Sequence, residues 1–177
     1  MDESALVKRC INGDQKAQQV LFDRFAPKML AVCIRYAKDV VQAEDVLQSA
    51  FIKVFTKLDS FNGGSLEGWI RRIMVNTALD EIRKNKKRTQ NVTIDAVEFK
   101  VESNNFIVEE LQAEDLMKII SCMPEGYKVV FNMFAIEGYS HKEIAEQLEI
   151  SENTSKSQYS RAKAYLRAEL ERLGIER

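Results

Sequence analysis

The side chains that could perform catalysis do not form a catalytic arrangement in this sequence. The only histidine, His141, has no cysteine or serine partner at a spacing that supports nucleophilic catalysis. Paired carboxylates such as Asp80 and Glu81 are adjacent, and adjacent side chains diverge on a helix. Neither a dinucleotide-binding nor a P-loop glycine pattern occurs. The sequence therefore indicates a protein that is not an enzyme, and we expect His141 to be a surface residue.

The cysteines give no support to a metal site or a disulfide framework. Cys10, Cys33 and Cys122 are scattered along the chain, with neither a CxxC pair nor a Cys/His spacing. Free cysteine behaves as a small apolar residue, so we expect all of them to be buried thiols. We expect neither a metal nor a small-molecule cofactor.

Basic residues are concentrated in one stretch, although the formal net charge of the chain is only −1. Residues 71–88 are strongly basic, whereas the acids of residues 95–115 are opposed only by Lys100. Contacts to DNA phosphates require clustered Lys and Arg rather than a positive total charge. This asymmetry indicates a nucleic-acid surface next to a solvated or self-masking acidic segment.

The chain is expected to be all-α, with two small helical domains joined by a flexible linker. Its 2 prolines and 7 glycines leave room for long helices. Residues 89–112 lack a helical stripe, so we assign them to the linker, residues 1–88 to one domain and residues 113–177 to the other. Neither a signal peptide nor a membrane-spanning run is evident, so we expect a cytoplasmic protein without membrane insertion.

Capping and breaking residues predict the helices of the first domain. Asp14 and Asp39 are suitable N-caps, the latter with Gln42 at capping-box spacing, and Pro27 suits the first turn of a helix. Residues 60–68 must form a loop. The expected helices cover roughly residues 15–25, 27–38, 40–58 and 69–84.

The second domain is predicted to end in a helix-turn-helix. Ser140 and Glu143 form a capping box, and Ser151 caps a longer helix after a short turn. Two helices joined so tightly are typical of this motif. The expected helices cover roughly residues 113–122, 124–137, 141–148 and 152–173.

The two helices of this motif have complementary inner faces and a polar outer face. We expect Ile144, Ala145, Leu148 and Ile150 to pack against Tyr159, Ala162, Leu166 and Leu170. The amino-terminal end of the second helix enters a major groove in such motifs. Its outward residues are Asn153, Thr154, Lys156, Ser157, Ser160 and Arg161. On this pattern alone, an ordinary helical hairpin with a solvated face is the alternative.

The segment MPEGYKVVFNMFAIEGYSHKEIAEQLEISENTSKSQYSRAKAYLR resembles the carboxy-terminal domain of extracytoplasmic-function sigma factors. The matching positions are Pro124, Glu125, Glu137, Gly138, Ser140, Glu143, Ile144, Ala145, Leu148, Ile150, Ser151, Thr154, Lys156, Ser157, Arg161 and Ala162. The resemblance implies binding to the minus-thirty-five promoter element through Asn153, Thr154, Lys156, Ser157, Gln158 and Arg161.

Three residues depart from that family pattern. Glu149 replaces a frequent turn glycine and resists a positive φ, so we expect a slightly different turn. Ser155 stands where an apolar residue is usual. Gln158 stands where a basic residue is common, and we expect it to shift base preference toward adenine.

The segments AEDVLQSAFIKVFTKL and WIRRIMVNTALDEIRKNKKR resemble a second domain of the same family. Helical spacing places Val46, Leu47, Ala50, Val54 and Leu58 on a core stripe. The resemblance implies that the opposite face binds the clamp helices of the polymerase β′ subunit, through Asp45, Gln48, Ile52 and Lys53. A merely solvated face is the alternative.

The resemblance assigns the minus-ten element to the last helix of this domain and to the loop before it. Arg72, Asn76, Asp80 and Arg83 recur at helical steps along one face, and Asn62 and Ser65 lie in the loop. A base is extruded there at a cost of a few kcal/mol. Asn76 is the strongest candidate for a base contact, whereas we expect Trp69 to belong to the core.

The resemblance implies a sigma factor that binds the β and β′ subunits of RNA polymerase core and directs promoter-specific initiation. An anti-sigma factor is its expected regulatory partner. Two alternatives remain at this point: a helix-turn-helix regulator that does not bind the polymerase core, and a helical adaptor whose basic stretch binds RNA or acidic proteins. The first domain discriminates against the regulator because it shows no receiver or ligand-binding pattern.

Overall fold

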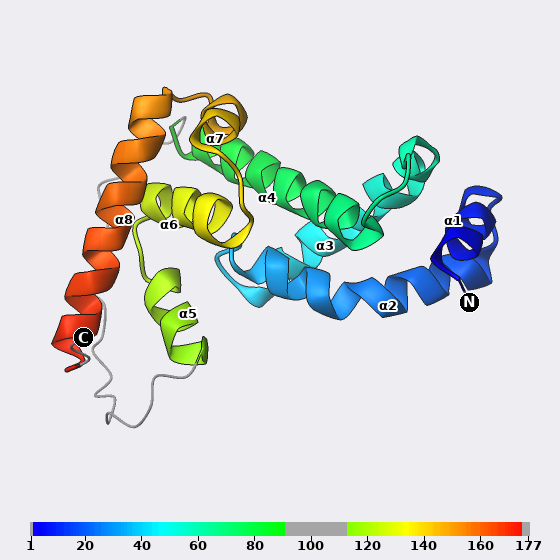
Figure 1. Ribbon diagram of the computed structural model, residues 1–177, viewed down its shortest axis with the longest axis horizontal. Helices are drawn as coiled ribbons and strands as arrows, with labels where there is room; N and C mark the ends of the chain where they lie inside the picture. Colours follow the sequence, from blue (N-terminus) through cyan, green and yellow to red (C-terminus); the bar gives the residue numbers. More distant parts are fainter. Residues whose placement is uncertain (1, 91–112, 175–177) are drawn as a thin grey trace. The chain divides into compact units, whose positions relative to one another are not determined.

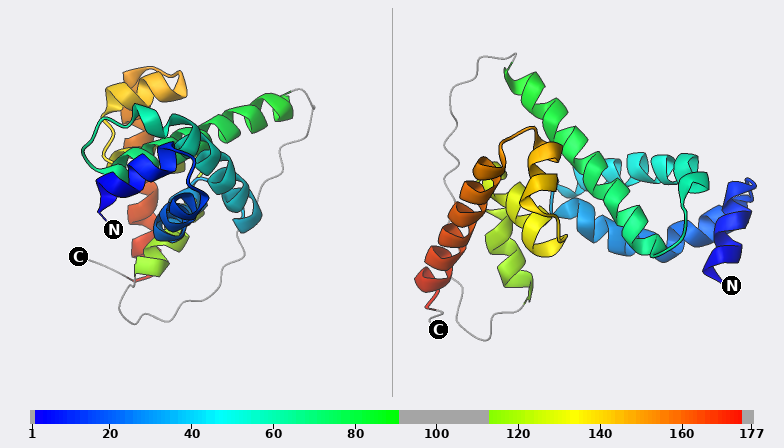
Figure 2. Two further views of the ribbon diagram at one scale, coloured as in Figure 1. Left: turned by 90° about the vertical axis from the view of Figure 1, so that its right-hand side faces the viewer. Right: turned by 45° about the horizontal axis from the view of Figure 1, so that its top comes forward.

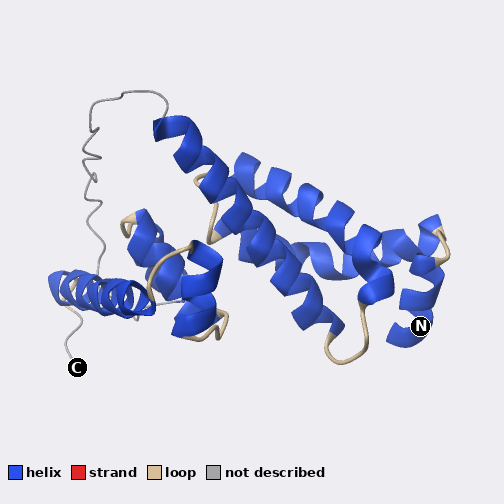
Figure 3. Cartoon of the chain, turned by 90° about the horizontal axis from the view of Figure 1, so that it is seen from above, coloured by secondary structure: helices blue, strands red, loops and turns tan. Residues whose placement is uncertain are grey.

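The structure, a computed structural model, describes residues 2–90 and 113–174. Every regular element in these two ranges is a helix (Figure 3). The described residues form two compact units, one before and one after the gap between the ranges. The predicted all-α fold with two helical domains is therefore confirmed. Residues 91–112 of the predicted flexible linker lie outside the described residues.

The first unit is built from three long helices and a short amino-terminal one (Figure 1). Its helices are α1 (Glu3–Ile11), α2 (Gln15–Ile34), α3 (Val40–Lys57), the 3-10 turn η1 (Leu58–Ser60) and α4 (Leu66–Gln90). Helices α2, α3 and α4 all contact one another, and Figure 2 shows them side by side from two further directions. An apolar core fills the space between them.

The helix starts in this unit follow the predicted caps. The Asp14 carboxylate accepts a hydrogen bond from the Ala17 N–H over 3.1 Å. The Asp39 carboxylate accepts one from the Gln42 N–H over 2.8 Å. The Gln42 side chain does not return to Asp39, because it accepts instead from the N–H of Lys38. Both caps satisfy amide groups that have no partner within the helix.

The predicted break at Pro27 is wrong, because α2 continues through it. A proline inside a helix removes one hydrogen bond and usually bends or breaks it. Here Pro27 is exposed, whereas Phe25 and Met29, on either side of it, are buried. Burial along a single face of α2 on both sides of Pro27 outweighs the local cost of the proline.

Helix α4 begins earlier and ends later than predicted. Ser65 acts as its N-cap, with the hydroxyl accepting a hydrogen bond from the Gly68 N–H over 3.0 Å. The first helical residue, Leu66, is fully buried, so tertiary packing extends the helix backward into the expected loop. Trp69 is only half buried, which corrects its assignment to the core.

The second unit contains α5 (Ala113–Ser121), α6 (Glu125–Phe131), η2 (Asn132–Ile136), α7 (His141–Leu148) and α8 (Glu152–Arg172). The element η2 is a π-helical turn, so the predicted single helix from Pro124 changes its hydrogen-bond pattern near its end. In that turn the Glu137 N–H donates to the Asn132 carbonyl over 2.9 Å. The capping box of Ser140 and Glu143 is present as predicted.

The expected packing within the helix-turn-helix is correct only in part. Ile144 of α7 is fully buried as predicted. Ala162 and Leu166 of α8, however, pack against Ile120 of α5 and against Met123, which lies just after α5. The pattern of apolar residues on α8 showed its inner face but not which helices cover it. Helix α7 contacts the first half of α8 through His141, which lies against Ser155 and Tyr159.

The turn between α7 and α8 corrects the expectation for Glu149. Glu149 adopts the left-handed conformation, with φ 55° and ψ 44°. It therefore takes the turn geometry that a glycine would take, and the turn is not altered. A residue with a side chain pays about 1 to 3 kcal/mol for this conformation.

The cysteines lie partly where they were expected. Cys10 and Cys33 are buried, and burial raises the pKa of the Cys33 thiol to about 12. Cys122 is exposed, which contradicts the prediction of buried thiols throughout. It lies just after the end of α5, in the turn that leads to α6.

Candidate nucleic-acid interface

The outer face of α8 carries the polar residues that the sequence placed there. Asn153, Lys156, Ser157 and Arg161 are all exposed. The Lys156 ammonium lies 2.7 Å from the Glu152 carboxylate one turn earlier. This hydrogen bond lowers the pKa of Glu152. In the free protein Lys156 is therefore held along the helix by an acid that a DNA phosphate would have to replace.

Two of the predicted base-reading residues have other surroundings. The Thr154 hydroxyl lies 2.7 Å from the Ser151 hydroxyl at the helix cap. The Gln158 amide lies beside Gly126 of α6. The two are so close that a Cβ atom at position 126 would be 3.5 Å from the Nε2 atom of Gln158. Both side chains are half buried. The expected adenine contact of Gln158 finds no support in this geometry.

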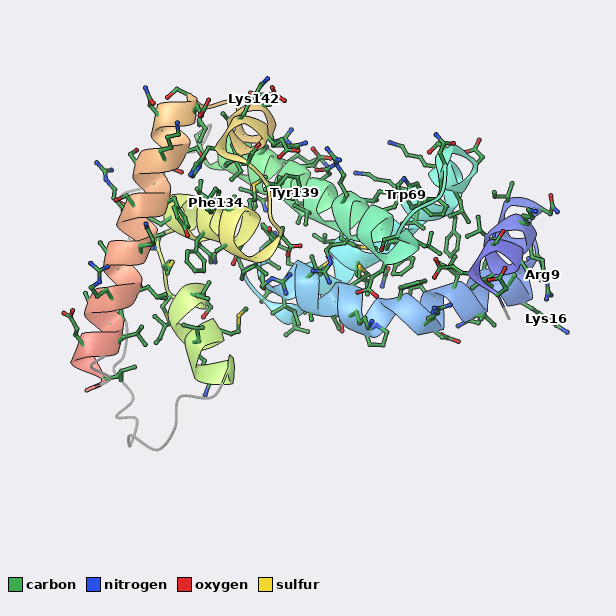
Figure 4. The ribbon with its side chains drawn as sticks, viewed as in Figure 1. Arg9, Lys16, Trp69, Phe134, Tyr139 and Lys142 are labelled. Atoms are coloured by element: carbon green, nitrogen blue, oxygen red, sulfur yellow. The ribbon has the colours of Figure 1, made fainter. Side chains whose placement is uncertain are left out.

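His141 is not the surface residue that was expected. Its ring is half buried and lies 4.3 Å from the ring of Phe134, nearly parallel to it at 14°. A hydrogen bond of 2.9 Å joins its Nδ1 to the hydroxyl of Ser155. Phe134 and the neighbouring exposed residue Lys142 are labelled in Figure 4. The histidine thus belongs to the contact between α7 and α8.

Helix α3 presents the predicted core stripe and the predicted exposed face. All members of the stripe are buried: Val46, Leu47, Ala50, Val54 and Leu58. Asp45 and Gln48 are exposed, and the Ile52 side chain is 68% exposed. Contiguous exposed apolar surface marks docking sites, whereas single exposed aliphatic residues are common on protein surfaces.

One residue of this face was missed. Val41 is 69% exposed and precedes Asp45 by four residues, so it continues the stripe formed with Gln48 and Ile52 toward the start of α3. Helical spacing could have identified it, because four positions before Asp45 lies Val41, in the valine pair that follows the Asp39 cap.

The fourth predicted docking residue, Lys53, connects α3 to α4. Its ammonium donates to the Asp80 carboxylate of α4 over 3.3 Å. Arg83 also pairs with Asp80 over 3.3 Å. Asp80 therefore holds two cations in place, and its own charge would repel a DNA phosphate. Lys53 and Asp80 are far apart in the sequence, so helical spacing could not predict that they pair.

The other residues of the α4 face differ in accessibility. Arg72 is exposed, whereas Asn76 and Arg83 are half buried. The Oδ1 atom of Asn76 is buried and has no hydrogen-bond partner among the described residues. A buried polar atom without a partner costs about 1 to 3 kcal/mol. A base amino group could supply the missing hydrogen bond once the Asn76 side chain turned outward from this buried position.

The loop before α4 presents Asn62 and Ser65 to solvent. Gly63 and Gly64 between them have φ values of 95° and 86°, which only glycine adopts readily. The rings of Phe61 and Trp69, 5.6 Å apart, close the base of the loop. Figure 4 shows Trp69 on the first part of α4. The loop therefore has fixed ends and an open, polar tip.

Within residues 2–90 and 113–174, no three His, Cys, Asp or Glu side chains gather in a way that could hold a metal ion. No helix in these ranges is both long and apolar enough to span a membrane.

Sequence families match both units. Residues 21–88 match the family described as Sigma-70 region 2, and residues 113–166 match Sigma-70, region 4. The chain is 31% identical over 175 residues to the ECF RNA polymerase sigma-E factor of Escherichia coli K12, covering 92% of this chain and 91% of that protein. It is 29% identical over 174 residues to the RNA polymerase sigma-H factor of Pseudomonas aeruginosa, covering 91% and 90%.

Solved structures show the same fold. The sigma factor RpoE of Bartonella quintana, in complex with the anti-sigma factor NepR, has a TM-score of 0.56 at 24% identity, with 90% of this chain and 98% of that chain covered. CnrH, in complex with the cytosolic domain of CnrY, has a TM-score of 0.50 at 21% identity, with 94% and 96% covered.

Proposed function

The chain belongs to the extracytoplasmic-function group of the sigma-70 family, and on that premise we propose which of its residues contact RNA polymerase and promoter DNA. It is a sigma factor that binds the polymerase core and directs promoter-specific transcription initiation. Sigma factors are not enzymes, so RNA synthesis is performed by the core. The alternatives of a regulator without core binding and of an RNA-binding adaptor are thereby set aside.

Residues 1–88 form the domain that docks on the core, through the exposed stripe of α3. The observation that carries this assignment is Ile52, an aliphatic side chain left 68% exposed among Val41, Asp45 and Gln48. Interface residues that become buried in a central pocket of the partner often contribute most of the binding free energy. Lys53 contributes from the edge of the stripe, where Asp80 orients it.

Binding to core polymerase tests this assignment. A chain with Asp45→Lys and Ile52→Ala is titrated against core, and we expect its affinity to fall by about 1 to 3 kcal/mol. Val20→Ala on α2 is the matched control, because Val20 is also exposed, at 47%, but lies outside the stripe. The control should bind as the unmodified chain does. Equal affinity of all three chains would refute the docking face.

The two promoter elements are assigned to different units. Residues 113–177 read the minus-thirty-five element through the exposed residues Asn153, Lys156, Ser157 and Arg161 of α8. The first domain reads the minus-ten element through the following residues: Asn62, Ser65, Arg72, Asn76 and Arg83. The exposed tip of the loop and the unpartnered Asn76 oxygen support this second assignment. Asp80 orients Arg83 rather than contacting DNA.

The chain acts in the cytoplasm and is controlled by an anti-sigma factor. The first point follows from its function, since a bacterial polymerase core and its promoters are cytoplasmic. The second is supported by the solved sigma factor RpoE of the same fold, which was captured with the anti-sigma factor NepR. Co-purification of a bound partner from the native cell, followed by its displacement with core polymerase, tests the second point.

A further inference from the structure

We propose that His141 and Ser155 form a hydrogen-bonded pair that positions the first turn of α8 and thereby determines which bases this helix reads. The inference rests on the proposed role of α8 at the minus-thirty-five element. Neither residue touches DNA in this proposal, so both are positioning residues. They act through Asn153, Lys156 and Ser157, which lie next to Ser155 on the exposed face.

Ser155 is a fully buried hydroxyl on the inner face of the recognition helix, with 0% of its surface exposed. A hydroxyl in such surroundings requires a hydrogen-bond partner. Among the described residues that partner is Nδ1 of His141, at 2.9 Å. A hydrogen bond is directional and has a narrow range of favourable distances and angles. Sliding or rotating α8 past α7 would therefore break it.

The histidine ring is itself held from two sides. It stacks on Phe134 of the π-helical turn η2 at 4.3 Å, and its edge meets Tyr159 of α8 at 5.8 Å and 60°. Phe134 and Tyr159 are also in contact, with ring centroids 4.5 Å apart. His141 thus links η2, α7 and α8. The aromatic contacts fix the ring, and the ring fixes Ser155.

An apolar pair at these positions would bury comparable surface without fixing the helix. Apolar contacts are non-directional, so a valine or phenylalanine packed there tolerates small shifts of α8. Base readout does not tolerate them, since bidentate contacts in the major groove depend on side-chain geometry. Helix α8 also packs against α6 and α7 through apolar contacts, and the His141–Ser155 pair adds a directional restraint to that packing.

Three variants separate positioning from stability. His141→Phe keeps a ring against Phe134 but leaves the Ser155 hydroxyl without its partner. The double variant His141→Phe with Ser155→Ala removes both polar groups, which is far less costly than leaving one of them unpaired. His141→Asn makes the opposite change to His141→Phe: it removes the ring but keeps a polar amide group near the position of Nδ1.

The test is a selection with the holoenzyme, using a duplex library randomised across both promoter elements. For the double variant we expect the base enrichment at the minus-thirty-five element to fall about tenfold, the scale of one lost base contact. Enrichment at the minus-ten element, read by the other unit, should stay unchanged and serves as the internal control. His141→Asn should keep the unmodified preference although its unfolding midpoint is lowered.

The outcomes are distinguishable. Unchanged minus-thirty-five enrichment in the double variant would overturn the pair's positioning role and leave the proposed function intact. Loss of enrichment that follows the unfolding midpoint across all three variants would also overturn it, since stability alone would then explain the effect. Absence of any minus-thirty-five preference with the unmodified chain would overturn both the proposed function of α8 and this inference.

Discussion

The two units solve the problem of orienting helices in different ways. In the first unit the described interior is apolar along α2, α3 and α4, and Thr77 is its one buried polar residue among those described. The second unit has a small core in which the polar residues Asn132 and Ser155 are fully buried. Long helices bury enough apolar surface to fix their arrangement by packing alone, whereas a small unit needs directional contacts as well.

This difference corresponds to the role that we propose for each unit. The first unit offers an exposed stripe and a loop, and it must mainly keep its three long helices together. The second offers a single helix whose first turn must stand at a defined angle. Buried polar groups contribute little net stability but are costly to leave unpaired, so they favour one arrangement over its neighbours.

Equal deletions in the two cores should have unequal consequences. Leu21→Ala in the first unit and Ile144→Ala in the second each remove a fully buried side chain, at a cost of about 2 to 5 kcal/mol. This cost is a large share of the stability of a small unit. Hydrogen exchange on the full chain should show α7 and α8 unfolded in Ile144→Ala, with α2 to α4 protected. Leu21→Ala should keep both units folded at 25 °C.

The opposite result would break the comparison. If Leu21→Ala unfolded the first unit while Ile144→Ala left α8 protected, the second unit would be the better packed one. The restraint by His141 and Ser155 would then lose its physical basis.

A smaller effect is expected from the exposed cations of α8. Lys156→Ala and Arg161→Ala should each leave the stability of the second unit unchanged, because both residues are exposed. Holoenzyme binding to promoter DNA should weaken by about 1 to 3 kcal/mol for a base contact, whereas loss of a phosphate contact mainly lowers the salt dependence. Titrations at several salt concentrations distinguish the two. Unaltered affinity and salt slope for the double alanine variant would exclude α8 from DNA reading.

Local signals in the sequence predicted much of both units. The caps at Asp14, Asp39 and Ser140 involve residues within three positions of each other, so their hydrogen bonds are visible in the sequence. The buried stripe of α3 follows from helical spacing in the same way. The exposed residues of α8, such as Lys156, also follow from it.

Contacts between distant residues could not be predicted. Lys53 and Asp80 are far apart in sequence, and helical spacing placed each on its own face without joining them. His141 was taken for a surface residue because nothing near it in the sequence shows the Ser155 hydroxyl, a full turn into the next helix. Helix α2 continues through Pro27 only because its neighbours in the fold bury both halves.

The strained turn in the second unit should be open to improvement. Glu149→Gly removes a side chain from a left-handed conformation and should stabilise the second unit by about 1 kcal/mol. Glu146→Gly, at an exposed position inside α7, is the matched control and should destabilise it by about 1 kcal/mol. Thermal or urea unfolding of the full chain reports both. Destabilisation by both glycines would show that Glu149 is not strained.

The smallest effect is expected at the cap of α2 in the first unit, and it depends on pH. Two nitrogens of the Arg9 guanidinium donate to the Asp14 carboxylate, at 2.8 and 2.6 Å, and these hydrogen bonds, with that from Ala17, lower the pKa of Asp14. A carboxyl whose pKa is lower in the folded than in the unfolded chain stabilises the fold at pH values above its unfolded pKa, about 3.9, and loses this contribution as the pH falls through the folded pKa.

Asp14→Asn keeps an oxygen that can accept from Ala17 but removes the charge. The variant should therefore be slightly less stable than the unmodified chain at pH 7, and the difference should vanish in acid. Urea unfolding of the first unit between pH 7 and pH 3 measures it, and a difference that does not change with pH would show that the Arg9 pair contributes nothing. In the second unit the corresponding acid is Glu152, whose partner Lys156 lies on the face that we propose to read DNA. Glu152 stands in the first turn of α8, where a carboxylate also favours the helix start, so Glu152→Gln should lower stability slightly. Its larger effect should be a gain in DNA affinity, because Lys156 is released from its partner, as expected if polar contacts at α8 serve recognition and those at α2 serve the fold.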